Sequence, residues 1–228
     1  MTVKDINRYL DHAVLKPEMT REEAIAAIQL GIDYKVRTVC VRPCDIELAV
    51  EMCKGTESEV SVTLAFPHGC TMSTVKADEA KRYIAAGVAE IDMVVNYGFV
   101  RSGMWDEVVA DIRAVTDVAK PVGVPIKVIF ETAYLTLDEI KRTVQCAIEA
   151  GADFVKTSTG FAHEGATEEK VQAMLDAADG KIKVKPSGGI RDYARAAMFV
   201  EMGAMRIGNG STSTVAICEG VGKSDASY

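Results

Sequence analysis

Short apolar runs rich in β-branched residues recur along the chain and alternate with longer amphipathic segments. Near-continuous apolar runs are typical of parallel strands that are covered on both faces. The predicted strands are residues 10–15, which form the weakest run, and 36–41, 60–64, 91–95, 126–130, 154–156, 182–184 and 204–207.

The segments between these runs have the period of helices. Residues 21–30 follow Thr20, a predicted N-cap, and Glu23 completes the pattern of a capping box. Residues 73–86 and 137–150 are amphipathic in the same way. Eight strands that alternate with helices predict an α/β fold, a closed (β/α)₈ TIM barrel. The alternative is an open doubly wound sheet, but the GxGxxG that would favour it is absent after the first strand.

The chain has 228 residues, a length at which single-domain barrels are common. No low-complexity linker interrupts it, so residues 1–228 are predicted to form one barrel domain with a short tail at about 221–228. The apolar runs fall far short of the ~20 residues that a membrane span needs. Since the N-terminus also lacks the apolar segment of a secretory signal, we expect a cytoplasmic protein.

Charge and cysteine content narrow the function further. The net charge is −7, so the overall field repels nucleic acid and anionic membranes, and neither is expected as a partner. The six cysteines include no CxxC pair, and the three histidines do not cluster with them in a zinc pattern. No metal site is therefore predicted.

Three charged residues lie inside or at the ends of predicted strands: Asp92, Lys156 and Lys185. A charge in an apolar strand costs free energy unless it is paired or used. One such residue alone favours a structural ion pair. Three of them favour a functional site, because the sites of (β/α)₈ barrels lie at the C-terminal ends of the strands.

Two lysines and one carboxylate suit amine catalysis. At pH 7 only about one free lysine in 2,500 is an uncharged nucleophile, and Schiff-base chemistry needs a pKa lower by about three. A second ammonium about 4 Å away repels the first by about 4 kcal/mol at an effective dielectric near 20, which is sufficient if the side chains converge. Lys185 is preferred to Lys181 and Lys183 as the second amine because it lies nearest the C-terminal end of its strand.

Two glycine-containing segments follow the last two predicted strands. One comprises Ser187, Gly188 and Gly189, and the other begins with Gly208, Asn209 and Gly210. The loops after strands seven and eight are the usual phosphate site of a barrel, where backbone N–H groups and a helix N-terminus bind the anion. Each segment alone is also consistent with an ordinary turn, but the two together favour a phosphorylated ligand.

These residues also carry a resemblance. The chain resembles the deoxyribose-phosphate aldolases, which are class I aldolases on a (β/α)₈ barrel. The matching phrases are LDHAVLKP at 10–17, VCV at 39–41, EIDMVVN at 90–96, GADFVKTSTGF at 151–161, GAT at 165–167, VKPSGGIR at 184–191 and RIG at 206–208. The resemblance extends over nearly the whole chain.

The resemblance implies that Lys156 forms a Schiff base, that Lys185 lowers its pKa, and that Asp92 relays protons with a bound water. The implied reaction is the reversible cleavage of 2-deoxy-D-ribose 5-phosphate to acetaldehyde and D-glyceraldehyde 3-phosphate, with no cofactor. Phosphorylated sugars and aldehydes would be the small-molecule partners. The chain would assemble as a homo-oligomer, a dimer or a tetramer.

The resemblance also implies substrate contacts. Asp11 would orient the lysine end of the site, and Cys40 would line the pocket, although a buried structural thiol is an equal alternative. Backbone groups of Gly188, Gly189, Asn209 and Gly210 would hold the phosphate. Tyr228 would reach into the site, whereas chain physics alone favours a frayed tail.

The sequence departs from the family pattern at several positions, and alternative functions remain open. Ala13 stands where the family usually has threonine, and His163 and Glu164 occupy a loop that usually has small polar residues. Glu164 would be an unwelcome charge near a phosphate if it pointed inward. Two other hypotheses stay open: a related class I aldolase that acts on a different sugar phosphate, and a phosphate-binding barrel without turnover.

Overall fold

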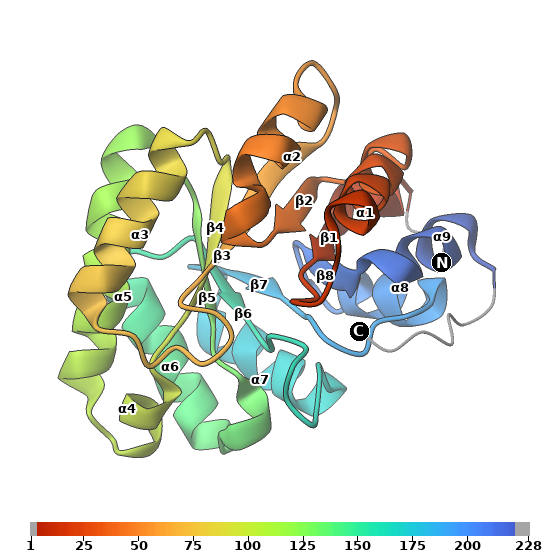
Figure 1. The fold of residues 1–228 in the computed structure, drawn as a ribbon. Coiled ribbons are helices and arrows are strands. Elements are labelled where there is room, and N and C mark those ends of the chain that lie inside the picture. The colour runs from red at the N-terminus through yellow and green to blue at the C-terminus, as the bar shows by residue number, and fades with distance from the viewer. Residues whose placement is uncertain (1–3, 222–228) are drawn as a thin grey trace.

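A computed structural model describes residues 4–221 and shows a single (β/α)₈ barrel, as predicted (Figure 1). The sheet has eight strands in the order β7-β6-β5-β4-β3-β2-β1-β8, and all the strand pairings within it are parallel. A bridge between Ser187 and Gly208 joins the two edge strands. The strands are β1 (Leu10–Val14), β2 (Thr38–Val41), β3 (Glu59–Leu64), β4 (Glu90–Val94), β5 (Ile126–Ile129), β6 (Phe154–Lys156), β7 (Lys183–Lys185) and β8 (Ile207–Gly210).

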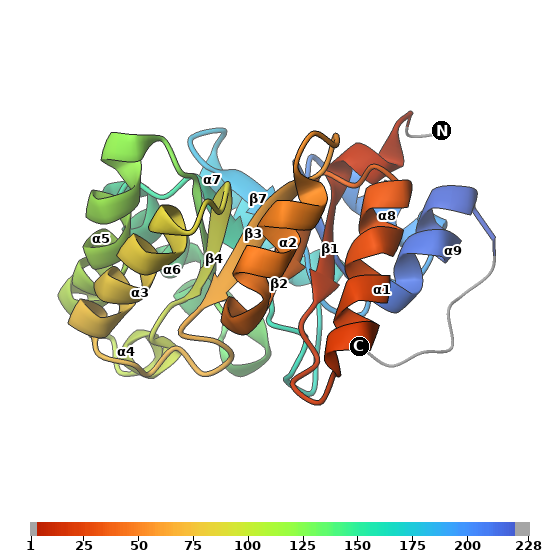
Figure 2. The same cartoon turned by 45° about the horizontal axis from the view of Figure 1, so that its top comes forward.

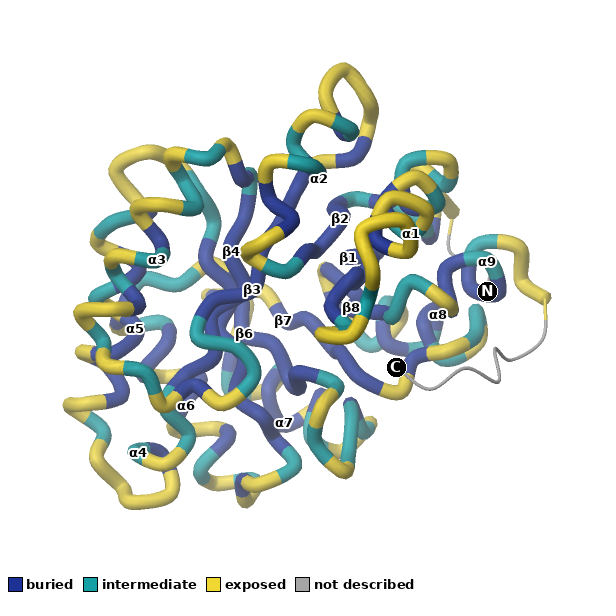
Figure 3. Tube along the Cα trace, viewed as in Figure 1, coloured by how far each residue is buried: buried dark blue, intermediate teal, exposed yellow. Residues whose placement is uncertain are grey.

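Helices surround the strands, and the views in Figures 1 and 2 show them as an outer layer. In Figure 3 the buried part of the trace follows the strands, while exposed residues lie on the outer helices and loops. The α-helices are α1 (Arg21–Asp33), α2 (Ile46–Cys53), α3 (Ser73–Ala85), α4 (Tyr97–Arg101), α5 (Trp105–Ala119), α6 (Leu137–Glu149), α7 (Glu168–Ala178), α8 (Tyr193–Glu201) and α9 (Thr214–Glu219).

Local sequence explains where the helices begin and which face they bury. Thr20 and Glu23 form the predicted capping box of α1, in which each side chain binds the other residue's backbone N–H. Helix α6 begins with a capping box as well. Ile140, Val144 and Ala147 lie on one face of α6 at helical spacing and are buried, so this face packs on the barrel.

The last two strands lie further along the chain than predicted. Strand β8 covers Ile207–Gly210 instead of 204–207, and β7 covers Lys183–Lys185 instead of 182–184. Strand β8 pairs residue by residue with β1, from Leu10 with Ile207 to Ala13 with Gly210. Hydrophobic pattern alone missed this because glycine is a weak strand former. Here the barrel interior beside Gly208 has no room for a side chain.

The two faces of the sheet differ in chemistry. Residues that face the helices are apolar and form the main core, for example Val62, Ile91 and Val128. Residues that face the barrel axis include many polar and charged side chains, and in-register neighbours such as Asp92 and Lys127 meet there. The barrel interior is therefore a buried polar layer enclosed by an apolar one.

Candidate active site

Asp92 lies at the centre of the barrel and contacts three lysines. Its Oδ2 accepts hydrogen bonds from Lys156 Nζ at 2.8 Å and from Lys185 Nζ at 2.7 Å. Its Oδ1 accepts one from Lys127 Nζ at 2.8 Å. Because two amines share one oxygen, Lys156 Nζ and Lys185 Nζ are at most 5.5 Å apart, the sum of their two distances. The structure thus brings together the three residues that the sequence singled out.

Asp11 holds the opposite side of Lys185. Its Oδ2 accepts a hydrogen bond from Lys185 Nζ, and its Oδ1 accepts from Thr38 Oγ1 at 2.7 Å and from Arg206 Nη1 at 2.6 Å. These bonds fix the carboxylate without help from position 13. Ala13, where the family usually has threonine, lies instead in a small apolar cluster with Leu15 and Cys40.

Sequence reasoning missed three members of this group: Lys127, Glu90 and Arg206. Lys127 Nζ lies 2.5 Å from a Glu90 oxygen, and Arg206 binds Glu90 with two nitrogens at 2.8 and 3.0 Å. The signal that identified Asp92 could have found Lys127, because both are charges inside an apolar strand. Glu90 lies just before a predicted strand, where a charge is ordinary, whereas the same signal could have found Arg206, which lies inside the predicted run 204–207.

Together these side chains form what we call the interior charge cluster. Every member is buried, with at most 6% of its surface exposed. Three members are acidic and four are basic, so full ionisation would leave one excess positive charge in a low-dielectric interior. The cluster consists of Asp11, Glu90, Asp92, Lys127, Lys156, Lys185 and Arg206.

The pKa directions within the cluster show which charges persist. Burial opposes ionisation of Asp92, but the surrounding lysines hold the pKa of its carboxyl well below the ordinary value. Burial also opposes the charge on Lys127, yet its carboxylate neighbours raise its pKa. Burial lowers the pKa of Lys185, and the nearby ammonium groups lower it further against the pull of Asp11 and Asp92. The excess positive charge therefore falls on the lysine pair at the C-terminal ends of β6 and β7.

The two glycine-containing segments lie side by side. Gly188 and Gly189 have φ values of 84° and 73°, a left-handed conformation that glycine adopts without strain. Gly189 lines one small hollow together with Gly208, Asn209 and Gly210. The Asn209 side chain does not enter the barrel, since its Nδ2 donates to Thr214 Oγ1.

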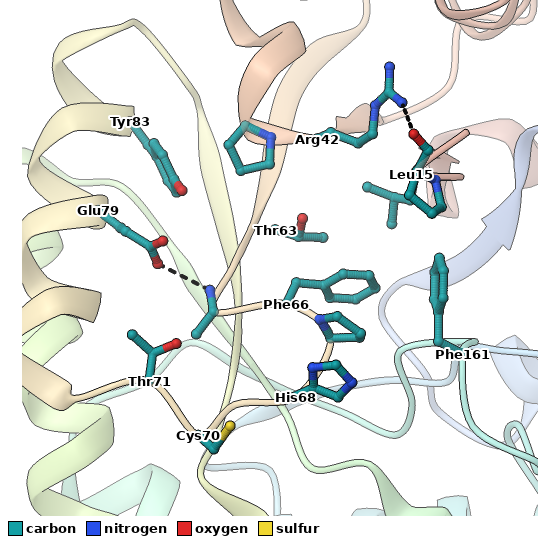
Figure 4. A pocket seen from close by; sticks show the side chains of 14 residues that line it. Leu15, Arg42, Thr63, Phe66, His68, Cys70, Thr71, Glu79, Tyr83 and Phe161 are labelled. Atoms are coloured by element: carbon teal, nitrogen blue, oxygen red, sulfur yellow. Dashed lines mark hydrogen bonds between the residues drawn. The ribbon is translucent and has the colours of Figure 1, made fainter. Parts of the chain in front are cut away.

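A cavity of about 440 Å³ opens beside the barrel mouth, at the C-terminal ends of β1 to β3 (Figure 4). Leu15, Phe66 and Phe161 form apolar parts of its wall, and the two phenylalanine rings meet edge to face at 5.3 Å. Thr63 also lines it and pairs in register with Asp92, so the cavity reaches the strand next to β4. Cys40 is buried in the adjoining apolar cluster, and burial raises the pKa of its thiol.

The remaining predicted residues lie away from the charges or outside the described part. Glu164 forms an ion pair with Lys170, whose Nζ also donates to the Thr132 carbonyl at 2.8 Å. His163 packs edge to face against Tyr134. Glu164 is thus paired with a lysine of the following helix, α7. Tyr228 lies outside the described residues.

No group of three or more His, Cys, Asp or Glu within residues 4–221 could hold a metal ion. In the same range, no helix has the length and apolar character that crossing a membrane requires.

Fold and site together define a class: an α/β barrel with a buried lysine pair on one carboxylate, beside glycine-containing loops. The match to known proteins is consistent with this class. Residues 7–220 match the family described as DeoC/LacD family aldolase, and the chain belongs to this aldolase family.

Similar proteins support the assignment. The deoxyribose-phosphate aldolase of Streptococcus sanguinis (strain SK36) is 45% identical over 215 residues, which cover 94% of this chain and 96% of that protein. A crystal structure of a putative deoxyribose-phosphate aldolase from Coccidioides immitis has a TM-score of 0.90 at 37% identity, covering 94% of this chain and 85% of that one. The aldolase from Aeropyrum pernix, described as a unique tetrameric structure of deoxyribose phosphate aldolase, has a TM-score of 0.85 at 28% identity, covering 94% and 89%.

Proposed function

We propose that this protein catalyses the reversible cleavage of 2-deoxy-D-ribose 5-phosphate to acetaldehyde and D-glyceraldehyde 3-phosphate through a Schiff base on Lys156. The observation that carries the proposal is the placement of Lys156 and Lys185 on one oxygen of Asp92. The relatives named above share this substrate in their names.

Charge balance supports Lys156 as the nucleophile. The interior charge cluster has one base in excess, so loss of one proton from the lysine pair brings it to neutrality. Burial and the neighbouring ammonium groups lower the pKa of Lys185, but Lys185 lies between two carboxylates, Asp11 and Asp92, which oppose this lowering and favour its ammonium form. Lys156 then supplies the free amine, and Lys185 keeps the positive charge that lowers the pKa of its neighbour.

The reaction follows from this division of roles. The Lys156 amine attacks C1 of the open-chain sugar, and Asp92 carries protons while the carbinolamine loses water. The resulting iminium accepts the electrons of the C2–C3 bond when the C3 hydroxyl loses its proton. D-glyceraldehyde 3-phosphate leaves, and the enamine is protonated and hydrolysed to release acetaldehyde. The protein groups named here suffice for each electron movement.

The glycine-containing segments would hold the other end of the substrate. Backbone N–H groups around Gly188, Gly189 and Gly210 suit a phosphate, and α8 begins only a few residues beyond Gly189. Asp11 would orient Lys185, and Cys40 with Leu15 would border the aldehyde end. We place the enzyme in the cytoplasm as a homo-oligomer, in keeping with the tetramer of its Aeropyrum relative. Light scattering after size-exclusion chromatography would test the assembly, and a monomer would contradict it.

Borohydride trapping tests the proposed reaction. The protein is reduced in the presence of 2-deoxyribose 5-phosphate, and intact and peptide masses are measured. We expect a two-carbon adduct on Lys156, because only cleavage leaves acetaldehyde on the amine. A Lys181→Arg variant, altered at a lysine whose side chain is 62% exposed, should be labelled like the wild type.

The other outcomes separate the alternatives. A full-length sugar-phosphate adduct without cleavage would point to a related aldolase with another substrate. Saturable binding of the sugar phosphate without any adduct would contradict the proposal and indicate a barrel without turnover. An adduct on Lys185 instead of Lys156 would reverse the assigned roles.

A further inference from the structure

One hydroxyl inside the barrel is buried and has no hydrogen-bond partner. Ser187 is fully buried, and its Oγ has no partner among residues 4–221. A buried, unpaired hydroxyl costs about 1–3 kcal/mol, so such a group needs a partner from outside the chain. Asn209 also has an unpaired buried oxygen, but its side chain points away from the barrel, toward Thr214.

The contacts around Gly208 locate the Ser187 hydroxyl. A Cβ placed on Gly208 would lie 2.4 Å from Ser187 Oγ and 3.2 Å from Lys185 Cε. The hydroxyl and the stem of Lys185 therefore pack on the same glycine, on the inner face of the barrel. Thr157 fixes the backbone at this point, because its Oγ1 accepts from Ser187 N at 2.9 Å and donates to Ser187 O at 3.0 Å.

The Ser187 hydroxyl lies between the two ends of the proposed site, the lysine pair and the glycine-containing segments. Lys185 is two residues before it, and Gly188 and Gly189 follow it directly. Ser158 has a second buried hydroxyl without a partner in the described chain, and a Cβ on Gly188 would lie 3.5 Å from Ser158 Cβ. The strip between the lysines and the glycine-containing segments thus carries uncharged hydroxyl groups.

We propose that Ser187 Oγ binds the C4 hydroxyl of the substrate and determines specificity for hydroxylated aldehydes. This inference rests on the proposed function. With C1 at Lys156 and the phosphate at the glycine-containing segments, the C3 and C4 hydroxyls lie between them. The C3 hydroxyl loses its proton during cleavage and belongs near Asp92. The C4 hydroxyl stays intact, and it becomes the hydroxyl next to the carbonyl in glyceraldehyde 3-phosphate.

The chemistry of serine fits this partner. A hydroxyl both donates and accepts hydrogen bonds, as a sugar hydroxyl does. A site built to bind a substrate hydroxyl discriminates against an analogue that lacks it, because the protein group is then left unpaired. Ser187 would therefore act on the choice of acceptor rather than on imine formation at Lys156.

The test runs the reaction in the direction of synthesis, with acetaldehyde and two phosphorylated acceptors. D-glyceraldehyde 3-phosphate and 3-oxopropyl phosphate differ by the single hydroxyl at issue. For Ser187→Ala we expect kcat/KM with the first acceptor to fall about tenfold. With the second acceptor it should stay within about twofold of wild type, because no hydroxyl contact is lost. The thermal midpoint without ligand should stay the same or rise, because an unpaired buried hydroxyl has been removed.

Ser58→Ala is the matched control. Ser58 is also buried, but its Oγ donates to the Val36 carbonyl at 2.9 Å, just before β3 at the other end of the barrel. This variant should lose stability and keep the wild-type ratio between the two acceptors.

Two results would overturn the inference about Ser187 while the proposed function stands. One is an equal loss with both acceptors in Ser187→Ala, which would place the hydroxyl on the phosphate or in a structural role. The other is a kcat/KM for glyceraldehyde 3-phosphate that stays within about twofold of wild type. A wild-type protein that joins acetaldehyde to neither acceptor and forms no trapped imine would instead overturn the proposed function, and the role of Ser187 with it.

Discussion

Two clusters in this molecule bury lysine against carboxylate, and they differ in charge balance. Between α3 and α5, Lys76 Nζ donates to Asp111 at 2.7 Å and to the Val94 carbonyl at 2.9 Å. Asp111 also accepts from Ser73 Oγ at 2.8 Å and from Asn96 N at 3.0 Å. One positive charge meets one negative charge, and both carboxylate oxygens are hydrogen-bonded.

The interior charge cluster is built differently. It has four basic groups for three carboxylates, and two of the amines share one carboxylate oxygen. Both clusters are buried, so burial of a lysine does not by itself indicate a catalytic site. The interior charge cluster differs in two ways. It has one more basic group than it has carboxylates, and its lysine pair lies at the C-terminal ends of β6 and β7, toward the mouth of the barrel.

The largest expected effect is at Lys156, where a substitution should abolish activity and leave stability nearly unchanged. Lys156→Arg places a permanently charged guanidinium at this position and leaves no amine that can form an imine, so kcat/KM should fall by about 10⁴-fold or more. The free energy of unfolding should change little, because Lys185, whose pKa is already lowered by burial, can lose its proton instead and keep the interior charge cluster neutral. Steady-state cleavage assays and urea unfolding measure the two effects. Activity within tenfold of wild type would mean that another amine carries the reaction.

Lys76 should show the opposite behaviour. Lys76→Met leaves Asp111 buried without its cation, and breaking a buried pair in this way costs about 4 kcal/mol. The active-site residues are untouched, so kcat per folded molecule should stay at the wild-type value. Urea unfolding measures the loss of stability. Active-site titration by imine trapping gives the fraction of folded enzyme, from which kcat per folded molecule is calculated.

Restoring neutrality provides the control for Lys76. In Lys76→Met/Asp111→Asn the uncompensated charge is gone, so part of the lost stability should return. A tenfold fall in kcat of the folded single variant would show that this pair affects catalysis, and the contrast between the two clusters would fail.

His12 is a third kind of buried titratable group, one that stays neutral. Its Nε2 lies 2.8 Å from the Ala27 carbonyl and its Nδ1 lies 2.7 Å from Thr214 Oγ1. Burial lowers the pKa of His12 to about 4, although the Ala27 bond opposes this. In the unfolded chain His12 is therefore protonated as the pH falls through about 6.5, whereas in the folded protein it stays neutral until about pH 4.

This difference fixes the sign of the pH effect. The contribution of His12 is present above pH 6.5 and is lost progressively as the pH falls toward 4, by about 3 kcal/mol in total. Unfolding free energies of wild type and His12→Gln between pH 7.5 and about 4 measure it. The variant should start less stable, and the gap should narrow on acidification. A constant gap would mean that His12 does not titrate in this range.

The sequence predicted most of the barrel because hydrophobic period and helix caps are local signals. Strand β6 and the capping box at Thr20 and Glu23 were correctly placed for this reason. The site was predicted only in part. Asp92 stands out as a charge in an apolar strand, whereas the pairing of Glu90 with Arg206 joins residues 116 positions apart and has no local signal. The unpaired Ser187 hydroxyl also has no local signal in the sequence, because its burial depends on packing against Gly208.

The smallest effect is expected at Glu164, a carboxylate in the loop after β6. Its side chain is 38% exposed and paired with Lys170, so it belongs to neither buried cluster. Glu164→Gln should change the free energy of unfolding by less than about 0.5 kcal/mol, as is usual for a partly solvated ion pair. Because the charge is already neutralised beside Lys170, KM for the sugar phosphate should stay within about twofold. A markedly lower KM in the variant would show that Glu164 repels the phosphate, and the charges that govern this site would then extend beyond the barrel interior.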